Sequence, residues 1–178
     1  MLDGAARVGQ LMDAVRDQGM PAIAVTDHGN TFGAFDFWRQ AKDRGINPII
    51  GIEAYLTPGT FRGDRSRVRW GDGGGDDVSG GGAYTHMTML SETTEGMHNL
   101  FRLSSRSSIE GYYFKPRADR ELLHQYSKGL IATTSCPSGE IHTRLRLGQY
   151  KEAREAAAEF QSIFGKENFF CEIMDHGL

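Results

Sequence analysis

The chain alternates short apolar runs with longer segments whose apolar residues recur at helical spacing. The run that begins at Ala22 contains β-branched residues and lies between Pro21 and a polar corner, Thr26-Asp27-His28-Gly29. This pattern is typical of a strand buried on both faces. A second apolar run, Pro48–Tyr55, follows after one intervening segment. We therefore predict strands over residues 22–27 and 48–55.

The segment between these two strands has the pattern of a helix. Asn30 is placed to cap it and Gly45 to end it. Its apolar side chains, which we expect to face the core, are those of Phe32, Phe35, Trp38 and Ala41.

A helix–glycine–strand joint recurs along the chain. Asp17-Gln18-Gly19-Met20 is similar to Asp43-Arg44-Gly45-Ile46, and Gly129 and Gly165 stand before further apolar runs. We predict parallel strands near residues 22–27, 48–55, 130–134 and 169–174 with helices outside the sheet. This arrangement indicates an α/β fold with a parallel sheet, open or closed.

One stretch, Thr57–Ala83, departs from this pattern. It is rich in glycine and charge, and it contains Arg62-Gly63-Asp64-Arg65. We expect a mobile insertion loop that does not pack against the domain. Its arginines could contact phosphate, while a simple solvated insertion is the alternative.

Composition narrows the classes of function. The 178 residues fit a single domain, and the net charge of −3 excludes a broad basic field for nucleic acid. Only two cysteines are present, which favours reduced thiols and a cytoplasmic location. No apolar run approaches the ~18 residues of a membrane span, so we expect no membrane contact.

Five residues of types that commonly bind metals lie at predicted strand ends, within a strand or at helix starts. They are Asp3, His28, Glu53, His86 and Cys136. Carboxylate, imidazole and thiolate together suit a zinc-type or other transition-metal site. Their spacing is dispersed, so other roles stay open. Asp3 fits a helix N-cap, His86 an ordinary half-buried histidine, and Cys136 a small core residue.

Five further polar residues are candidates for the same site or for contacts with a substrate. Asp27 has two possible roles, orienting His28 or stabilising its turn, beside direct ligation. Glu172 and His176 stand at the end of the last predicted strand and could face the same site. Lys115 and Arg117, in the connector Gly111-Tyr112-Tyr113-Phe114-Lys115-Pro116-Arg117, are candidates for contacts with a DNA backbone.

Several motifs together resemble the polymerase and histidinol phosphatase (PHP) family. They are Met1-Leu2-Asp3-Gly4-Ala5-Ala6, Ala24-Val25-Thr26-Asp27-His28-Gly29-Asn30, Pro48-Ile49-Ile50-Gly51-Ile52-Glu53-Ala54-Tyr55, Thr94-Glu95-Gly96-Met97-His98-Asn99-Leu100, Gly111-Tyr112-Tyr113-Phe114-Lys115-Pro116-Arg117 and Cys136-Pro137-Ser138-Gly139-Glu140. Within the family they are most similar to the N-terminal PHP domains of bacterial replicative DNA polymerase III alpha subunits. The resemblance covers essentially the whole chain, residues 1–178.

The resemblance implies a distorted seven-stranded β/α barrel, here incomplete at its first strand and its last part. It also implies up to three divalent ions, zinc, manganese or iron, in a phosphoesterase or 3′–5′ proofreading exonuclease site. Asp3 and His28 resemble ligands of one ion, Glu53 a bridging carboxylate, and His86 and Cys136 ligands of a second ion. The family's His-x-His near the start and Asp-x-His from a late strand have no counterpart here.

The resemblance further implies that the chain is a fragment of a DNA-directed DNA polymerase, acting in DNA replication with DNA and other replicase subunits as partners. We expect the fragment alone to be inactive. Two alternatives remain: a free-standing phosphatase of the histidinol-phosphate type, and a degenerate module that only supports contacts with partners.

Overall fold

The computed structural model describes residues 4–75 and 77–175. The helices are α1 (Val8–Asp17), α2 (Ala34–Asp43), α3 (Ser79–Gly82), α4 (Thr94–Glu110), α5 (Arg120–Tyr126), α6 (Glu140–Arg146) and α7 (Tyr150–Phe164). The strands are β1 (Ala22–His28), β2 (Asn47–Leu56), β3 (Thr85–Ser91), β4 (Arg117–Ala118), β5 (Leu130–Thr133) and β6 (Phe169–Phe170). In the described residues, no helix is long and apolar enough to cross a membrane.

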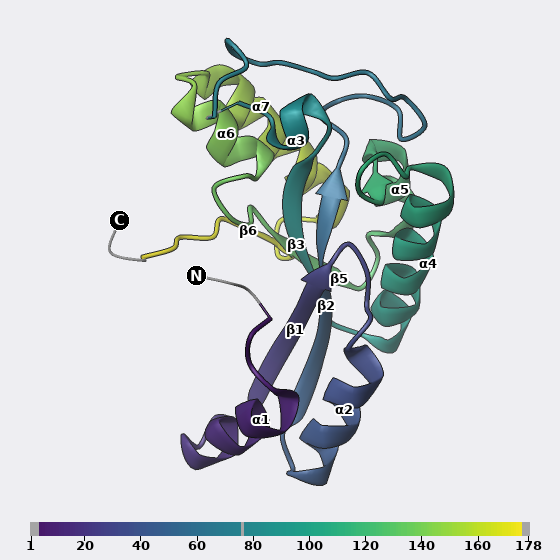
Figure 1. The fold of residues 1–178 in the computed structure, drawn as a ribbon, viewed down its shortest axis with the longest axis vertical. Coiled ribbons are helices and arrows are strands. Elements are labelled where there is room, and N and C mark those ends of the chain that lie inside the picture. The colour runs from purple at the N-terminus through teal and green to yellow at the C-terminus, as the bar shows by residue number, and fades with distance from the viewer. Residues whose placement is uncertain (1–3, 76, 176–178) are drawn as a thin grey trace.

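The strands form one sheet in the order β1-β2-β3-β5-β6, with β4 also paired to β2 (Figure 1). The pairs β1–β2, β2–β4 and β5–β6 are parallel, whereas β3 runs antiparallel to both β2 and β5. All strands except β3 therefore run in the same direction. The four strands predicted as parallel are confirmed, although the last is shorter than expected, and the α/β fold agrees with an incomplete PHP-type barrel.

The hydrophobic core lies between one face of the sheet and the helices. Strand alternation places Ile50, Ile52 and Ala54 of β2 on this face, where they pack with Phe37 of α2 and Leu100 of α4. The opposite face of β2 carries Gly51, Glu53 and Tyr55, so the sheet divides an apolar side from a polar one.

The prediction that β1 is buried on both faces is wrong. Its burial alternates, with Ala24, Thr26 and His28 exposed and the residues between them partly buried. β1 pairs only with β2 in the described sheet, and its exposed face is the polar face of that sheet.

The predicted apolar face of α2 is right only for Ala41. Phe32 and Phe35 are mostly exposed and Trp38 is 45% exposed, while Phe37 and Ala41 are buried. Asn30 does not cap the helix, because its side chain accepts a hydrogen bond from the Thr31 amide. Gly33 is the N-cap, and its amide is bound by Asp27.

The segment from Thr57 to Ala83 has little regular structure, as predicted, but the expectation that it does not pack is wrong. Arg62 is buried and its guanidinium forms ion pairs with Glu110, Asp119 and Glu121 at 2.6, 3.0 and 2.9 Å. Further along, the Arg144 guanidinium lies 3.7 Å from the centre of the Trp70 ring. The segment is therefore anchored at several points between α4–α5 and α6.

Candidate metal centre

Glu53 stands at the centre of the polar face. Its strand β2 is paired on one side with β1, where His28 is its partner, and on the other with β3, where Thr88 is opposite and His86 lies two residues away. This register brings side chains from both neighbouring strands to the Glu53 carboxylate. An acid at this place in an otherwise apolar strand is thereby supplied with polar partners.

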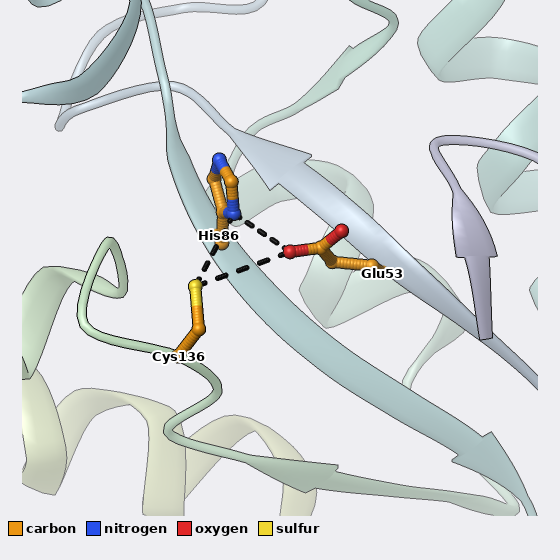
Figure 2. A group of neighbouring side chains, drawn as sticks. All are labelled: Glu53, His86 and Cys136. Atoms are coloured by element: carbon orange, nitrogen blue, oxygen red, sulfur yellow. Dashed lines mark hydrogen bonds and ion pairs between the residues drawn. The ribbon is translucent and has the colours of Figure 1, made fainter. Parts of the chain in front are cut away.

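Three side chains converge on one point (Figure 2). The Nδ1 atom of His86 lies 2.7 Å from Oε1 of Glu53 and 3.4 Å from Sγ of Cys136. The Cys136 sulfur is 4.0 Å from the same Glu53 oxygen. One ligand atom from each residue lies within 4.8 Å of the other two. These separations suit ligands that share one ion, because bonds of about 2.0–2.3 Å place the donor atoms roughly 3–4 Å apart.

The backbone around Cys136 aims its thiol at this point. Ser135 has a φ of 62°, a left-handed conformation that costs a non-glycine residue about 1–2 kcal/mol. The following turn is closed by the Gly139 amide, which donates to the Cys136 carbonyl, and it is tied to β3 by the His86 amide, which donates to Ser138. A Cβ on Gly139 would lie 2.2 Å from the Thr134 carbonyl, so only glycine fits there.

The three groups perturb one another electrostatically. Burial lowers the pKa of His86, but its contacts with Cys136 and Glu53 outweigh this and raise the pKa to about 9. Burial raises the pKa values of Glu53 and Cys136, yet hydrogen bonds and charge from His86 bring both below their ordinary values. These shifts favour a protonated His86 at neutral pH, with its Nδ1 atom facing the Glu53 carboxylate and the Cys136 thiol.

Two tyrosines form an aromatic wall behind His86. The Tyr84 ring stacks on the imidazole with centres 5.7 Å apart, and the Tyr55 ring meets it edge-on at 5.2 Å. The two tyrosine rings also contact each other at 5.0 Å. Burial and the nearby Glu53 carboxylate raise the pKa of Tyr55 to about 12, so its phenol stays neutral. Neither tyrosine was predicted from the sequence, although Tyr55 lies two residues after Glu53 and Tyr84 lies two residues before His86.

The structure places the other candidates around this cluster in different ways. His28 is joined to the second Glu53 oxygen, Oε2, and its side chain is 53% exposed. Asp27 stabilises its turn, because its carboxylate accepts the Gly33 amide at 2.6 Å. Glu172 lies beside β5, where it accepts the Thr133 hydroxyl at 2.5 Å and is not part of the three-residue group. Asp3 and His176 lie outside the described residues.

One of the two phosphate candidates is in the wrong place. Arg117 is fully buried, and its guanidinium donates to the carbonyls of Gly111, Ala83, Arg62 and Asp64 at 2.7–3.1 Å. It is a structural residue, which sequence position alone could not reveal. Lys115 is only partly buried, and its Nζ lies 5.3 Å from the centre of the Tyr55 ring.

The donor set fits a divalent transition metal. A carboxylate, an imidazole and a thiol suit a borderline-soft ion such as zinc, and their mutual distances allow bonds of about 2.0–2.3 Å to one centre. The raised pKa of His86 and the lowered pKa values of Glu53 and Cys136 agree with a site that favours positive charge between these groups.

Comparison with known proteins agrees with this arrangement. The pattern that defines the PHP domain matches residues 1–176. The chain belongs to the PHP domain family. The resemblance noted from its motifs is therefore confirmed.

Relatives extend the match over the whole chain. DNA polymerase III subunit alpha of Saccharopolyspora erythraea is 58% identical over 187 residues, and that of Mycobacterium tuberculosis is 54% identical over 181 residues. The protein of the same name from Deinococcus radiodurans is 43% identical over 183 residues. Each match covers 100% of this chain but only 13–16% of the relative. The chain is thus a PHP-domain segment similar to one part of these much longer proteins.

Proposed function

We propose that Glu53, His86 and Cys136 hold one divalent metal ion and that the PHP domain uses it to cleave phosphate esters. The convergence of three ligand atoms within 4.8 Å carries this proposal. Zinc suits the mixed oxygen, nitrogen and sulfur set, and manganese and iron are the other ions we expect for the family.

A second ion would share Glu53. Because Oε1 faces His86 and Cys136 while Oε2 faces His28, the carboxylate is placed to bridge two positions. His28 would be a ligand of the second ion, with Asp3 proposed as another from the sequence. Up to three ions are proposed for a complete domain.

A bound divalent ion would supply a Lewis acid that polarises a phosphoryl oxygen and lowers the pKa of water to about 7. The chain's own residues set the geometry and charge of the site that would hold this ion. Glu53 keeps its negative charge at neutral pH, since its pKa is below the ordinary value. Tyr55 and Tyr84 shield one side of the imidazole, and the left-handed Ser135 fixes the direction of the Cys136 thiol. No side chain is required as nucleophile.

We propose that the parent protein is a bacterial replicative DNA polymerase alpha subunit. The support is that the relatives bear this name and match the chain over its whole length. The substrate of the PHP site would then be a DNA strand cleaved from its 3′ end, and DNA and other replicase subunits would be the partners. Polymerisation would belong to the parent chain.

We expect the 178-residue chain alone to have little nuclease activity. Cleavage of a diester with metals on both the attacking and leaving oxygens needs two ions about 3.5–4 Å apart. Among the described residues, one group of three metal-binding side chains is brought together. One three-ligand ion provides half of such a clamp.

The test is a nuclease assay of this chain and of the full-length parent, with manganese or zinc, on primed and single-stranded DNA. We expect digestion by the parent that Glu53→Gln abolishes, and none by the chain. Metal-dependent digestion by the chain that Glu53→Gln removes would refute the inactivity and support the site. No digestion by an intact parent would favour a structural module.

A further inference from the structure

Three exposed arginines follow one another in the middle of the 57–83 segment. Arg65, Arg67 and Arg69 are exposed, and between the last two Val68 is half-buried with its amide bonded to the Gly82 carbonyl at 2.9 Å. None of the three arginines forms an ion pair with another described residue. We call Arg65, Arg67 and Arg69 the arginine ridge. Their charges are available to a ligand.

The ridge is held at both ends by buried charges. Before it, the Arg117 guanidinium binds the carbonyls of Arg62 and Asp64 at 3.0 and 2.7 Å. After it, the Asp77 carboxylate accepts the amides of Trp70 and Gly71 at 2.9 and 3.0 Å. These contacts hold the backbone of the ridge in place before a ligand binds. Binding would therefore lose little affinity to the ordering of this segment.

Nearby acids do not pair with the ridge. The Asp64 carboxylate accepts the amide and hydroxyl of Ser66 at 2.8 and 2.7 Å, and the Asp72 carboxylate accepts the Gly74 amide at 2.9 Å. Both acids are occupied by their own turns, which leaves a local positive surface on a chain whose net charge is −3.

Exposed aromatic rings accompany the ridge. The Arg67 guanidinium lies 5.4 Å from the centre of the Phe114 ring, which is 56% exposed. Tyr112, in the same connector, is 61% exposed. Phe114 has a φ of 61°, an unusual conformation for a large side chain, and the turn is closed by the Tyr113 amide bonded to Lys115. This backbone holds the Phe114 ring beside the Arg67 guanidinium, with more than half of its surface open to solvent.

The arginine ridge and the exposed rings lie near the cluster formed by Glu53, His86 and Cys136, which we call the metal cluster. A Cβ on Gly81 would lie 3.2 Å from the Arg67 guanidinium, and one on Gly80 would lie 2.4 Å from the Tyr84 ring, which stacks on His86. Lys115 lies over Tyr55, whose ring also contacts His86. In Figure 1 the segment crosses the sheet at the end where β2 finishes and β3 begins. Lys115 and the backbone beside Arg67 therefore lie next to the two tyrosine rings that contact His86.

We propose that the arginine ridge and the Tyr112–Lys115 connector bind a single-stranded nucleic acid whose end reaches the metal cluster. Guanidinium groups match phosphate, and exposed rings stack on bases that are not paired. A duplex would hide its base faces from these rings. This inference rests on the proposed phosphoesterase and adds the surface that would select an unpaired strand.

The first test measures binding without metal. A fluorescein-labelled oligothymidylate is titrated with the chain in EDTA, over a range of salt concentrations, by anisotropy. The combined variant Arg65→Gln, Arg67→Gln and Arg69→Gln should bind about tenfold more weakly. The slope of log affinity against log salt concentration should also become shallower by about 2, because each phosphate contact to a single strand contributes ~0.7 to that slope. Circular dichroism checks the fold of each variant.

The matched control removes the same charge elsewhere. Lys151, Arg154 and Lys166 are exposed on and just after α7. Their combined change to glutamine should leave affinity within about twofold, since it removes no phosphate contact. Equal losses in both triple variants would overturn the ridge as a site, as would wild-type binding by the ridge variant.

The second test concerns the rings. In Phe114→Asn the backbone is tolerated, because asparagine accepts the left-handed region, while the ring is lost. We expect about tenfold weaker binding of the single strand, since stacking on an aromatic ring contributes ~1–3 kcal/mol per base, and unchanged binding of a duplex. Equal losses for both forms of DNA would overturn the selection of an unpaired strand.

Failure of the two proposals can be told apart. If the ridge binds the strand but the intact parent cleaves nothing with metal, the phosphoesterase proposal fails alone. If the parent cleaves DNA and the ridge variant binds and cleaves it normally, the ridge proposal fails alone.

Discussion

Two regions hold charged side chains in buried or half-buried positions. One is the cluster of Glu53, His86 and Cys136, and the other is the 57–83 segment together with Arg117, which anchors it from β4. The two regions differ in the partners that their charged groups have. Arg117 donates to four backbone carbonyls, and Asp77 accepts amides from Trp70, Gly71, Gly73 and Val78. These charges are satisfied by the chain itself. In the cluster, a carboxylate and a thiol face the same imidazole nitrogen.

The difference separates structural charge from functional charge. A charge surrounded by backbone partners holds loops in place, whereas three converging ligand atoms form a site at which a metal ion can take the place of protons. Variants of the segment should therefore change stability and leave metal affinity nearly unchanged. Variants of the cluster should do the reverse.

Replacing Arg117 should have the largest effect. Arg117→Met leaves buried carbonyls without donors, so we expect the free energy of unfolding to fall by about 3–5 kcal/mol. Urea unfolding followed by circular dichroism measures this. Arg65→Met, on the exposed ridge, is the control and should change stability by no more than about 0.5 kcal/mol. Equal effects would mean that Arg117 is not a structural anchor.

Removing the Glu53 charge tests the cluster. Glu53→Gln keeps the shape but loses the carboxylate, so affinity for zinc should fall more than about 100-fold, beyond the range seen for partners of metal ligands. Calorimetric titration gives the affinity, and the free energy of unfolding should change by less than about 1 kcal/mol. Glu172→Gln, a carboxylate bound to Thr133 outside the cluster, is the control. A comparable loss in that variant would contradict the assignment.

Asp77 gives a smaller, pH-dependent effect on stability. Asp77→Asn should cost about 1–3 kcal/mol, because an amide cannot replace a carboxylate that accepts four backbone bonds. Burial raises the pKa of Asp77, but these bonds outweigh it and hold the pKa below its ordinary value.

The stabilisation from Asp77 is therefore present above the ordinary pKa of about 3.9 and is lost as the pH falls through the folded value. Urea unfolding at several pH values should show a constant gap between wild type and variant near neutrality that narrows below about pH 4. Asp72→Asn, which loses one exposed contact to Gly74, is the control. A gap that does not depend on pH would show that the ionised carboxylate is not the stabilising form.

The smallest effect should come from the backbone beside Cys136. Ser135→Val places a β-branched residue at a φ of 62°, which we expect to cost about 1–2 kcal/mol and to weaken zinc binding about tenfold by turning the thiol. Ser135→Gly adopts this conformation without strain and should keep both properties. Normal zinc affinity in the valine variant would show that the thiol is not positioned through Ser135.

The grouping of Glu53, His86 and Cys136 could be expected from the sequence, because each of them stands within or just after a predicted strand. Glu53 at the end of an apolar run, and His86 within another, needed only the sheet register to bring them together. The third group, Cys136, followed the end of β5. What the sequence could not give was the antiparallel direction of β3 and the aromatic wall of Tyr55 and Tyr84, since both depend on packing between distant segments.

The segment 57–83 was misjudged for a related reason. Glycine and charge usually indicate a solvated loop, but Arg62, Asp77 and the distant Arg117 bury their charges against partners far away in the sequence. The face of α2 was misjudged because Phe32 lies before the helix starts and because packing against β2 selects Phe37. Local patterns do not contain these long-range contacts.

The most direct test of the central claim is the X-ray absorption spectrum of the zinc-loaded chain. We predict one sulfur neighbour at about 2.3 Å together with nitrogen and oxygen neighbours at about 2.0–2.2 Å. The sulfur shell should disappear in Cys136→Ser and remain in Cys171→Ser, which removes the exposed cysteine. A spectrum with nitrogen and oxygen neighbours alone, or a sulfur shell that survives Cys136→Ser, would contradict the claim that Glu53, His86 and Cys136 hold one ion.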